Sequence, residues 1–85
     1  MNISKHEQRV LHELALGGAI HYLRGDNGKI RKVTCFTRDG NVLSDCTLEV
    51  FTRLKRRRLI HSQNGKPYRA SRLGIRSVRA ELNQR

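Results

Sequence analysis

The sequence predicts a small α+β domain with three helices, an inserted hairpin or meander, and a second hairpin before the last helix. Three observations predict this class. Apolar residues recur at helical spacing in three segments, the stretch between the first two segments changes to a strand-like period, and an Asn-Gly turn divides two short runs near the C-terminus. A chain of 85 residues buries only about 60–65% of its unfolded surface, so we expect residues 1–85 to form one domain.

The first helix is expected to begin after Ser4. Ser4 and Glu7 have the spacing of a capping box, in which each side chain satisfies the other residue's backbone amide. Gly17 and Gly18 provide a stop. Between these signals, one helical face is apolar: Val10, Leu11 and Leu14.

The segment after this helix predicts a meander. A Gly-Asp-Asn-Gly turn at residues 25–28 separates two strand-like runs, and a second turn follows at residues 37–40. The alternation of apolar residues slips by one position between Ile30 and Val33. The strands are expected at residues 19–24, 29–36 and 41–43.

A second helix is expected from a cap at Ser44 or Asp45 to about Arg57. Arg57 and Arg58 fall nearer the core side, so their side chains must reach out to solvent or lie beyond the helix end. The predicted buried face holds Thr47, Val50, Phe51 and Leu54. The opposite face holds Glu49, Thr52, Arg53 and Arg56, with Lys55 beside Leu48 on the flank.

The last third of the chain predicts a hairpin and a helix. Residues 59–63 and 66–70 flank Asn64-Gly65, and Pro67 lacks an N–H, so this hairpin should be an edge. Ser71 can cap the final helix. Its expected buried stripe is Ile75, Val78 and Leu82, and a neighbouring stripe is basic: Arg72, Arg76 and Arg79.

This order of elements resembles the C-terminal half of a winged helix, in which the helix before the hairpin enters the major groove and the hairpin lies over the backbone. The chain departs from that pattern at residues 19–43, where a hairpin replaces the usual short helix. The departure lowers the expectation of sequence-specific DNA reading. The likeness is carried by Phe51, Leu54, Leu59, Ile60, Tyr68, Arg69, Ser71 and Gly74.

The charge of the chain is strongly positive and unevenly distributed. The formal net charge is +11; residues 1–43 contribute +3 and residues 44–85 contribute +8. Arg outnumbers Lys nine to two in the second part, and Arg suits bidentate contacts with phosphate or carboxylate. Solubility alone could explain a few surplus cations, but this asymmetry favours an anionic partner.

Enzyme, metal and membrane functions find little support. Cys35 and Cys46 lie outside any C-x-x-C motif, and the four histidines lack zinc spacing, so no metal or cofactor is expected. No glycine-rich elbow supports a Cys–His nucleophile. The N-terminus lacks the apolar run of a signal peptide, and no stretch approaches the ~20 apolar residues of a membrane span. We expect a cytoplasmic protein with two free core thiols and no membrane partner.

The whole chain resembles the YjhX family of small bacterial proteins. The likeness rests on NISKHEQRVLHELALGG, CFTRDGNVLSDCTLEVFTRLKRRRLI, NGKPYR and RAELNQR, with SDCTLEVF the most specific part. This resemblance implies a toxin of a toxin–antitoxin pair that binds and inhibits DNA topoisomerase I, with an antitoxin similar to acetyltransferase-type proteins. The alternative is a winged-helix module that binds double-stranded DNA and regulates its own operon.

The candidate binding residues follow from the charge pattern and from position on the outward helix faces and the hairpin. Each group also has a purely structural explanation: Glu49 and Arg53 can form a helix-stabilising pair worth ~0.2–0.5 kcal/mol, the last helix can simply be solvated, and an Asn-Gly turn needs no ligand. The candidates for contact with nucleic acid or a protein partner are Thr52, Arg53, Lys55, Arg56, Lys66, Arg69, Arg72, Arg76 and Arg79.

Overall fold

The chain folds as three helices and two antiparallel sheets, which confirms the α+β class. The computed structural model describes the backbone of residues 3–82 and the side chains of residues 3–79. The elements in chain order are α1 (Lys5–Ala15), β1 (Ala19–Arg24), β2 (Ile30–Phe36), β3 (Val42–Leu43), α2 (Leu48–Arg56), β4 (Ile60–His61), β5 (Arg69–Ala70) and α3 (Arg72–Leu82).

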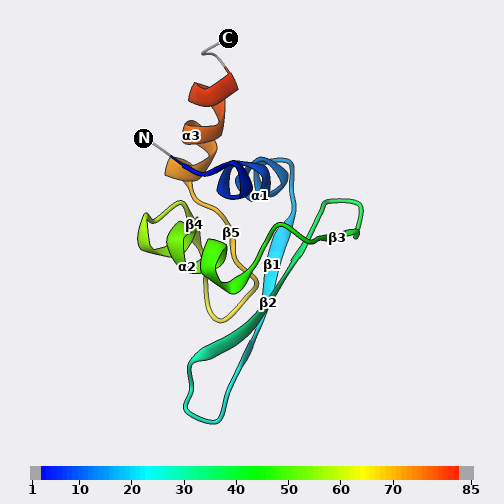
Figure 1. The fold of residues 1–85 in the computed structure, drawn as a ribbon, viewed down its shortest axis with the longest axis vertical. Coiled ribbons are helices and arrows are strands. Elements are labelled where there is room, and N and C mark those ends of the chain that lie inside the picture. The colour runs from blue at the N-terminus through cyan, green and yellow to red at the C-terminus, as the bar shows by residue number, and fades with distance from the viewer. Residues whose placement is uncertain (1–2, 83–85) are drawn as a thin grey trace.

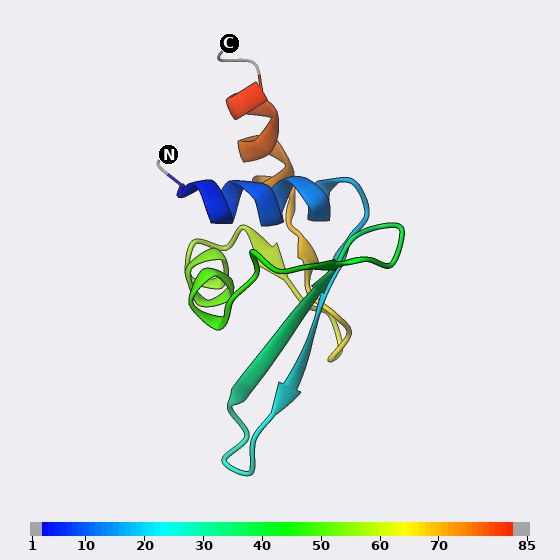
Figure 2. The ribbon, with the colours of Figure 1, turned by 45° about the vertical axis from the view of Figure 1, so that its right-hand side comes forward.

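α1 crosses the middle of the molecule, with α3 on one side and α2 and the sheets on the other (Figures 1 and 2). The outer part of the β1–β2 hairpin, residues 22–32, projects from this body and is called the arm below. The molecule measures 45 × 26 × 23 Å, and the arm and α3 lie at opposite ends of its long axis (Figure 1). No helix in the described part of the chain is long and apolar enough to cross a membrane.

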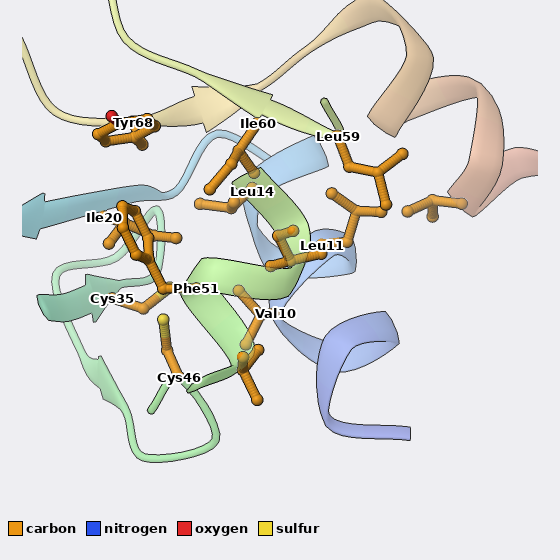
Figure 3. Packing of buried hydrophobic residues seen from close by; sticks show 13 residues of the cluster. Val10, Leu11, Leu14, Ile20, Cys35, Cys46, Phe51, Leu59, Ile60 and Tyr68 are labelled. Atoms are coloured by element: carbon orange, nitrogen blue, oxygen red, sulfur yellow. The ribbon is translucent and has the colours of Figure 1, made fainter. Parts of the chain in front are cut away.

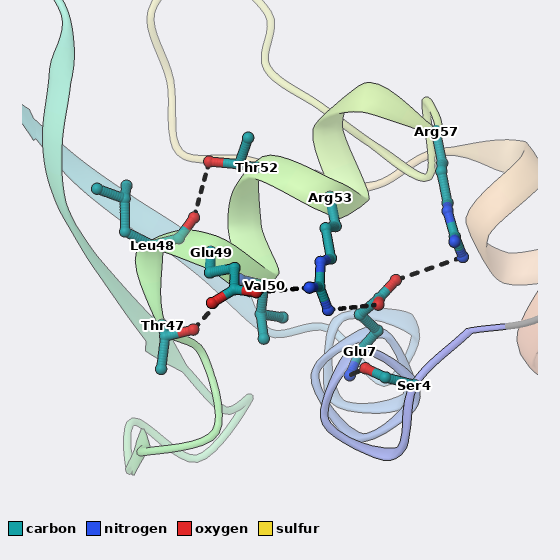
Figure 4. Close-up of polar contacts among 9 residues, drawn as sticks. All are labelled: Ser4, Glu7, Thr47, Leu48, Glu49, Val50, Thr52, Arg53 and Arg57. Atoms are coloured by element: carbon teal, nitrogen blue, oxygen red, sulfur yellow. Dashed lines mark hydrogen bonds and ion pairs between the residues drawn. The ribbon is translucent and has the colours of Figure 1, made fainter.

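α1 begins and ends where the sequence predicts. The Ser4 hydroxyl accepts the Glu7 amide at 3.1 Å, but the Glu7 carboxylate turns toward α2 and does not complete the expected box (Figure 4). At the other end, Gly17 adopts a φ of 116°, and the Gly18 amide donates to the Glu13 carbonyl at 3.0 Å. This pattern is a Schellman motif, in which glycine avoids the steric cost of positive φ.

The three strands β1, β2 and β3 form the predicted meander. Between the Leu23–Lys32 and Arg24–Ile30 pairs the register shifts, so Arg31 is an extra residue on β2. This β-bulge explains the slip in apolar alternation, because it returns Ile30 to the face that carries the core-facing residues of β2. The bulge therefore lets the arm keep an apolar residue on the side toward α2.

α2 begins later than predicted. Thr47, placed on the buried face by the helical pattern, is exposed and is the N-cap, and its hydroxyl accepts the Val50 amide at 3.2 Å. Cys46 is buried just before it, and residues 44–45 form a turn. Asp45, expected as a cap, instead has Oδ2 2.9 Å from Nδ1 of His6 on α1. Arg57 is the C-cap and Arg58 follows it, so both lie beyond the helix end, which is one of the two expected arrangements.

The C-terminal hairpin is shorter than predicted. β4 and β5 pair over only two residues each, because Pro67 cannot donate to the ladder near the turn. Asn64 and Gly65 have φ of 54° and 75°, and the Lys66 amide donates to the Gln63 carbonyl, as in a type I′ turn.

This hairpin is also less of a free edge than expected. The Tyr68 amide donates to the Ile20 carbonyl, and the Ile20 amide to the Tyr68 carbonyl, both at 2.9 Å. The segment of the C-terminal hairpin that leads into β5 is thereby attached to β1, and the two sheets hold each other in place.

One hydrophobic core joins the helices and both sheets (Figure 3). The most deeply buried side chains include Leu11, Ile20, Leu54 and Leu59. α3 approaches this core through Gly74, where an added Cβ would lie 2.2 Å from the Leu59 carbonyl oxygen. Only glycine permits this approach. The Leu82 side chain, expected in the buried stripe of α3, lies outside the described residues.

Both cysteines are free thiols in the core, as expected (Figure 3). The pKa of the Cys46 thiol is raised, chiefly by a hydrogen bond with Cys35 and secondly by burial. This thiol therefore stays protonated near neutral pH and packs as a small apolar residue.

Candidate partner-binding surface

The predicted outward face of α2 is exposed, but its arginines differ in their surroundings. Arg53 donates from Nη2 to Glu49 Oε1 at 2.5 Å, and its Nη1 lies 3.8 Å from Glu7 Oε1 (Figure 4). Arg57 Nη1 lies 3.5 Å from Glu7 Oε2. The Glu7 side chain is 2% exposed, so a nearly buried carboxylate on α1 forms ion pairs with Arg53 of α2 and with Arg57, the C-cap of that helix. Arg53 thus has a structural role, whatever else it contacts.

The other candidates on α2 have no acidic partner among residues 3–79, whose side chains the structure describes. Arg56 is exposed and forms no ion pair with the described part of the chain. The Thr52 hydroxyl donates to the Leu48 carbonyl at 2.8 Å, as is common within helices. Lys55 Nζ lies 5.9 Å from the centroid of the Tyr68 ring, on the flank of α2 that faces the sheets.

The C-terminal hairpin presents two further candidates. Lys66, at the type I′ turn, is exposed. Arg69 donates to the Gly17 carbonyl at 3.3 Å, so it reaches toward the end of α1. The Tyr22 hydroxyl donates to the Gly65 carbonyl at 3.0 Å, which ties the turn to the arm. The hairpin tip is therefore anchored by hydrogen bonds on one side and leaves Lys66 exposed.

The three arginines of α3 are all exposed, and none pairs with an acid in the described residues: Arg72, Arg76 and Arg79. Ser71 caps α3 by accepting the Gly74 amide at 3.0 Å, as predicted, and its hydroxyl donates to the Arg58 carbonyl at 2.7 Å. The start of α3 is thus joined to the end of α2.

The nine predicted residues do not gather in one patch. The candidates on α2 and the C-terminal hairpin lie on one side of α1, and α3 lies on the other (Figures 1 and 2). We call these two sets the α2–hairpin group and the α3 stripe. The α2–hairpin group comprises Thr52, Arg53, Lys55, Arg56, Lys66 and Arg69, and the α3 stripe comprises Arg72, Arg76 and Arg79.

Sequence reasoning missed Arg58. α2 ends in a Schellman motif: the Arg58 amide donates to the Lys55 carbonyl and the Leu59 amide to the Leu54 carbonyl, each at 3.0 Å. Arg58 takes the position with positive φ, at 61°, which α1 gives to Gly17. An exposed arginine held where glycine is sterically easier is a candidate functional residue. Its signal was the absence of glycine after the helix.

The arm is the second omission. Its exposed cations outnumber its single acid, Asp26. The net charge of residues 1–43 as a whole does not reveal this local excess. These cations are Arg24, Lys29, Arg31 and Lys32. The fold places two of them, Arg24 and Lys29, beside α2, which no local pattern indicates.

The described residues contain no group of three or more His, Cys, Asp or Glu side chains that could hold a metal ion. The chemistry that this surface offers is therefore cationic: guanidinium and ammonium groups that can contact phosphate or carboxylate.

Comparison with known proteins assigns the chain to a family. Full-length relatives, each called "UPF0386 protein", are 62% identical in Beijerinckia indica, 58% in Brucella anthropi and 53% in Aliivibrio fischeri, with all of both chains covered. No solved structure matches significantly. A family model described as "Putative toxin of bacterial toxin-antitoxin pair" matches residues 1–85. The chain belongs to this family, the YjhX toxin family.

Proposed function

We propose that this protein is a toxin that acts by binding another protein rather than by catalysis, and that its target is DNA topoisomerase I. Membership of the toxin family supplies the class, and an antitoxin is the cognate partner that a toxin–antitoxin pair implies. The choice of topoisomerase I comes from the resemblance described above.

The observation that carries the proposal is the set of exposed cations that lack acidic partners. In the described part of the chain, the ion pairs of Lys and Arg involve only Arg53 and Arg57. The other exposed cations of the C-terminal half remain available for carboxylates of a partner. Arginine suits this role because its planar fork binds a carboxylate through two parallel hydrogen bonds.

A DNA relaxation assay tests this function. Increasing amounts of the purified protein are added to topoisomerase I and supercoiled plasmid, and inhibition is expected to saturate. Charge pairs at an interface influence the rates of both association and dissociation. Removing three cations from the group that contacts the target should therefore raise the half-inhibitory concentration about tenfold or more. The variants are R56Q/K66Q/R69Q for the α2–hairpin group and R72Q/R76Q/R79Q for the α3 stripe.

A matched control removes the same charge elsewhere. K5Q/R9Q/R38Q changes three exposed cations outside both groups, so its inhibition should stay within about twofold of the parent protein if only local contacts matter. Unchanged relaxation at large molar excess of the parent protein would refute the proposal. Equal loss of inhibition in all three variants would mean that the effect comes from non-specific charge and not from a defined surface.

A second candidate function is binding of double-stranded DNA in the winged-helix manner. The observation that favours it is the anchored C-terminal hairpin beside an exposed Arg56 on the preceding helix. Binding to phosphates predicts that log K falls by ~0.9 per phosphate neutralised for each unit of log salt. Sequence reading further predicts that R56A weakens operator binding more than binding to a random duplex. Identical isotherms for the two duplexes would argue against regulation of an operon.

A further inference from the structure

A groove runs between α2 and the arm and contains none of the α3 stripe. Its volume is about 330 Å³, and its walls come from two segments that are distant in the sequence. One wall consists of residues at the start of α2 and on its flank toward the arm. The other wall consists of residues at and beside the turn of the arm. The lining residues that matter here are Arg24, Lys29, Ile30, Leu48, Thr52 and Lys55.

The groove is positively charged, and none of its lining residues is acidic. Two of its cations have neighbours that restrict them, and Arg24 is the more firmly placed. The Arg24 guanidinium donates to the Gly28 carbonyl at 2.8 Å and lies 5.3 Å from the centroid of the Tyr22 ring. Lys55 has a weaker restraint, since its Nζ lies 5.9 Å from the centroid of the Tyr68 ring. Cations positioned in advance lose less conformational entropy when an anion binds.

The same groove also has apolar lining residues. Leu48, the first residue of α2, is 41% exposed. Ile30, which the β-bulge turns toward α2, is only partly buried. Two large apolar side chains that stay partly exposed in one groove form a surface that a partner can cover with a favourable change in free energy.

We propose that this groove binds an acidic peptide segment of a partner protein, with one large apolar side chain of that segment seated between Leu48 and Ile30. The carboxylates on either side of the anchor then meet Arg24, Lys29 and Lys55. Charge complementarity selects an acidic occupant, and the apolar surface selects a peptide over a nucleic-acid duplex, because a duplex stacks its bases inside and presents charged phosphates outside.

The volume supports the same choice. A space of about 330 Å³ accommodates one or two side chains and not a duplex, which would have to lie across the rim. The mode is that of a peptide with a buried anchor and a charged surround. The groove shares Thr52 and Lys55 with the α2–hairpin group. This inference nevertheless does not depend on topoisomerase I being the target, since the groove needs only an acidic protein partner.

Fluorescence anisotropy with synthetic peptides tests the groove. The probe is a labelled peptide of nine residues, rich in Asp and Glu, with a central Phe; a second peptide carries Ser in place of Phe. In buffer with physiological salt we expect the Phe peptide to bind about tenfold more tightly, because the anchor buries apolar surface. A labelled random duplex serves as the nucleic-acid probe, and it should not displace the Phe peptide at matched charge.

Two pairs of variants separate the groove from general charge. K55Q and L48A alter the groove, and K32Q and L23A remove an exposed lysine and an exposed leucine from the opposite face of the sheet. We expect K55Q and L48A to weaken binding of the Phe peptide about fivefold or more. The control variants K32Q and L23A should weaken it less than about twofold. Thermal unfolding checks that each variant is folded.

Chemical-shift mapping on the parent protein gives an answer that needs no variant. Backbone amides of Thr52 and Lys55 should shift on addition of the Phe peptide, and those of the α3 stripe should not. Equal binding of the Phe and Ser peptides, equal loss in K55Q and K32Q, or displacement of the peptide by duplex would each overturn the proposal.

Discussion

The two flanks of α2 show how one helix uses the same kind of residue for different purposes. On the flank toward α1, Arg53 and the C-cap residue Arg57 face the nearly buried carboxylate of Glu7. On the flank toward the arm, Lys55 has an aromatic ring for a neighbour and shares its groove with no acid. The cations come from one short run of sequence, and what differs is the element packed opposite each of them.

This difference indicates which cations are available to a partner. A basic side chain that faces a buried acid stabilises the fold, and its removal disturbs the helix packing. A basic side chain without such an acid contributes little to stability, so its presence is better explained by binding. The charge run at residues 55–58 alone could not separate these roles.

The largest expected effect on stability is on the α1 flank. E7A removes the carboxylate that Arg53 and Arg57 share, and we expect the free energy of unfolding to fall by about 2 kcal/mol, because contacts to a charged group of low exposure are lost. Urea unfolding monitored by circular dichroism measures the change.

The matched control for this variant is E49A. Glu49 bonds the same Arg53 but is 71% exposed on the helix surface, so its loss should cost only about 0.3–0.5 kcal/mol. Similar losses in E7A and E49A would mean that the α1 flank holds no special contact, and the contrast between the flanks would fail.

The two Schellman ends give the next largest effect. G17A places a Cβ at positive φ and should destabilise the protein by about 1 kcal/mol. R58G should do the opposite and stabilise it by about 0.5–1 kcal/mol, because glycine tolerates the φ of 61°. Thermal unfolding of both variants provides the measurement.

R58G becomes informative when stability is compared with inhibition of DNA relaxation. If Arg58 is kept for contact with the target, the more stable variant should inhibit less. A variant that is both more stable and fully inhibitory would show that the side chain has no part in binding.

The smallest effect is expected on the arm flank. K55Q loses only a distant contact with the Tyr68 ring, so its free energy of unfolding should stay within about 0.5 kcal/mol of the parent. Its peptide affinity should fall nonetheless. Destabilisation comparable to that of E7A, measured by the same urea titration, would show that the two flanks are alike.

Local signals in the sequence predicted the elements well. The Ser4 cap, the Gly17 stop, the Asn64-Gly65 turn and the Ser71 cap are each set by a few neighbouring residues, and the structure confirms all four. Thr47 was misassigned because its helical-wheel position and its capping chemistry gave different answers, and capping prevailed.

Long-range features could not be predicted in this way. The partners of Glu7 lie 46 and 50 residues further along the chain, and the Ile20–Tyr68 bridge joins two sheets that share no sequence pattern. The slip before Val33 did mark the bulge, but only the β1–β2 register shows that it turns Ile30 toward α2. The candidate residues were therefore identified by charge, whereas their division into groups required the fold.

The most direct test of the proposed function is titration calorimetry of nuclease-treated protein against purified DNA topoisomerase I at two salt concentrations. The proposal predicts saturable binding in the absence of DNA, weaker at the higher salt because the contacts are between charges. Absence of binding without DNA would contradict it, and recovery of binding on addition of duplex would place the DNA-binding function first.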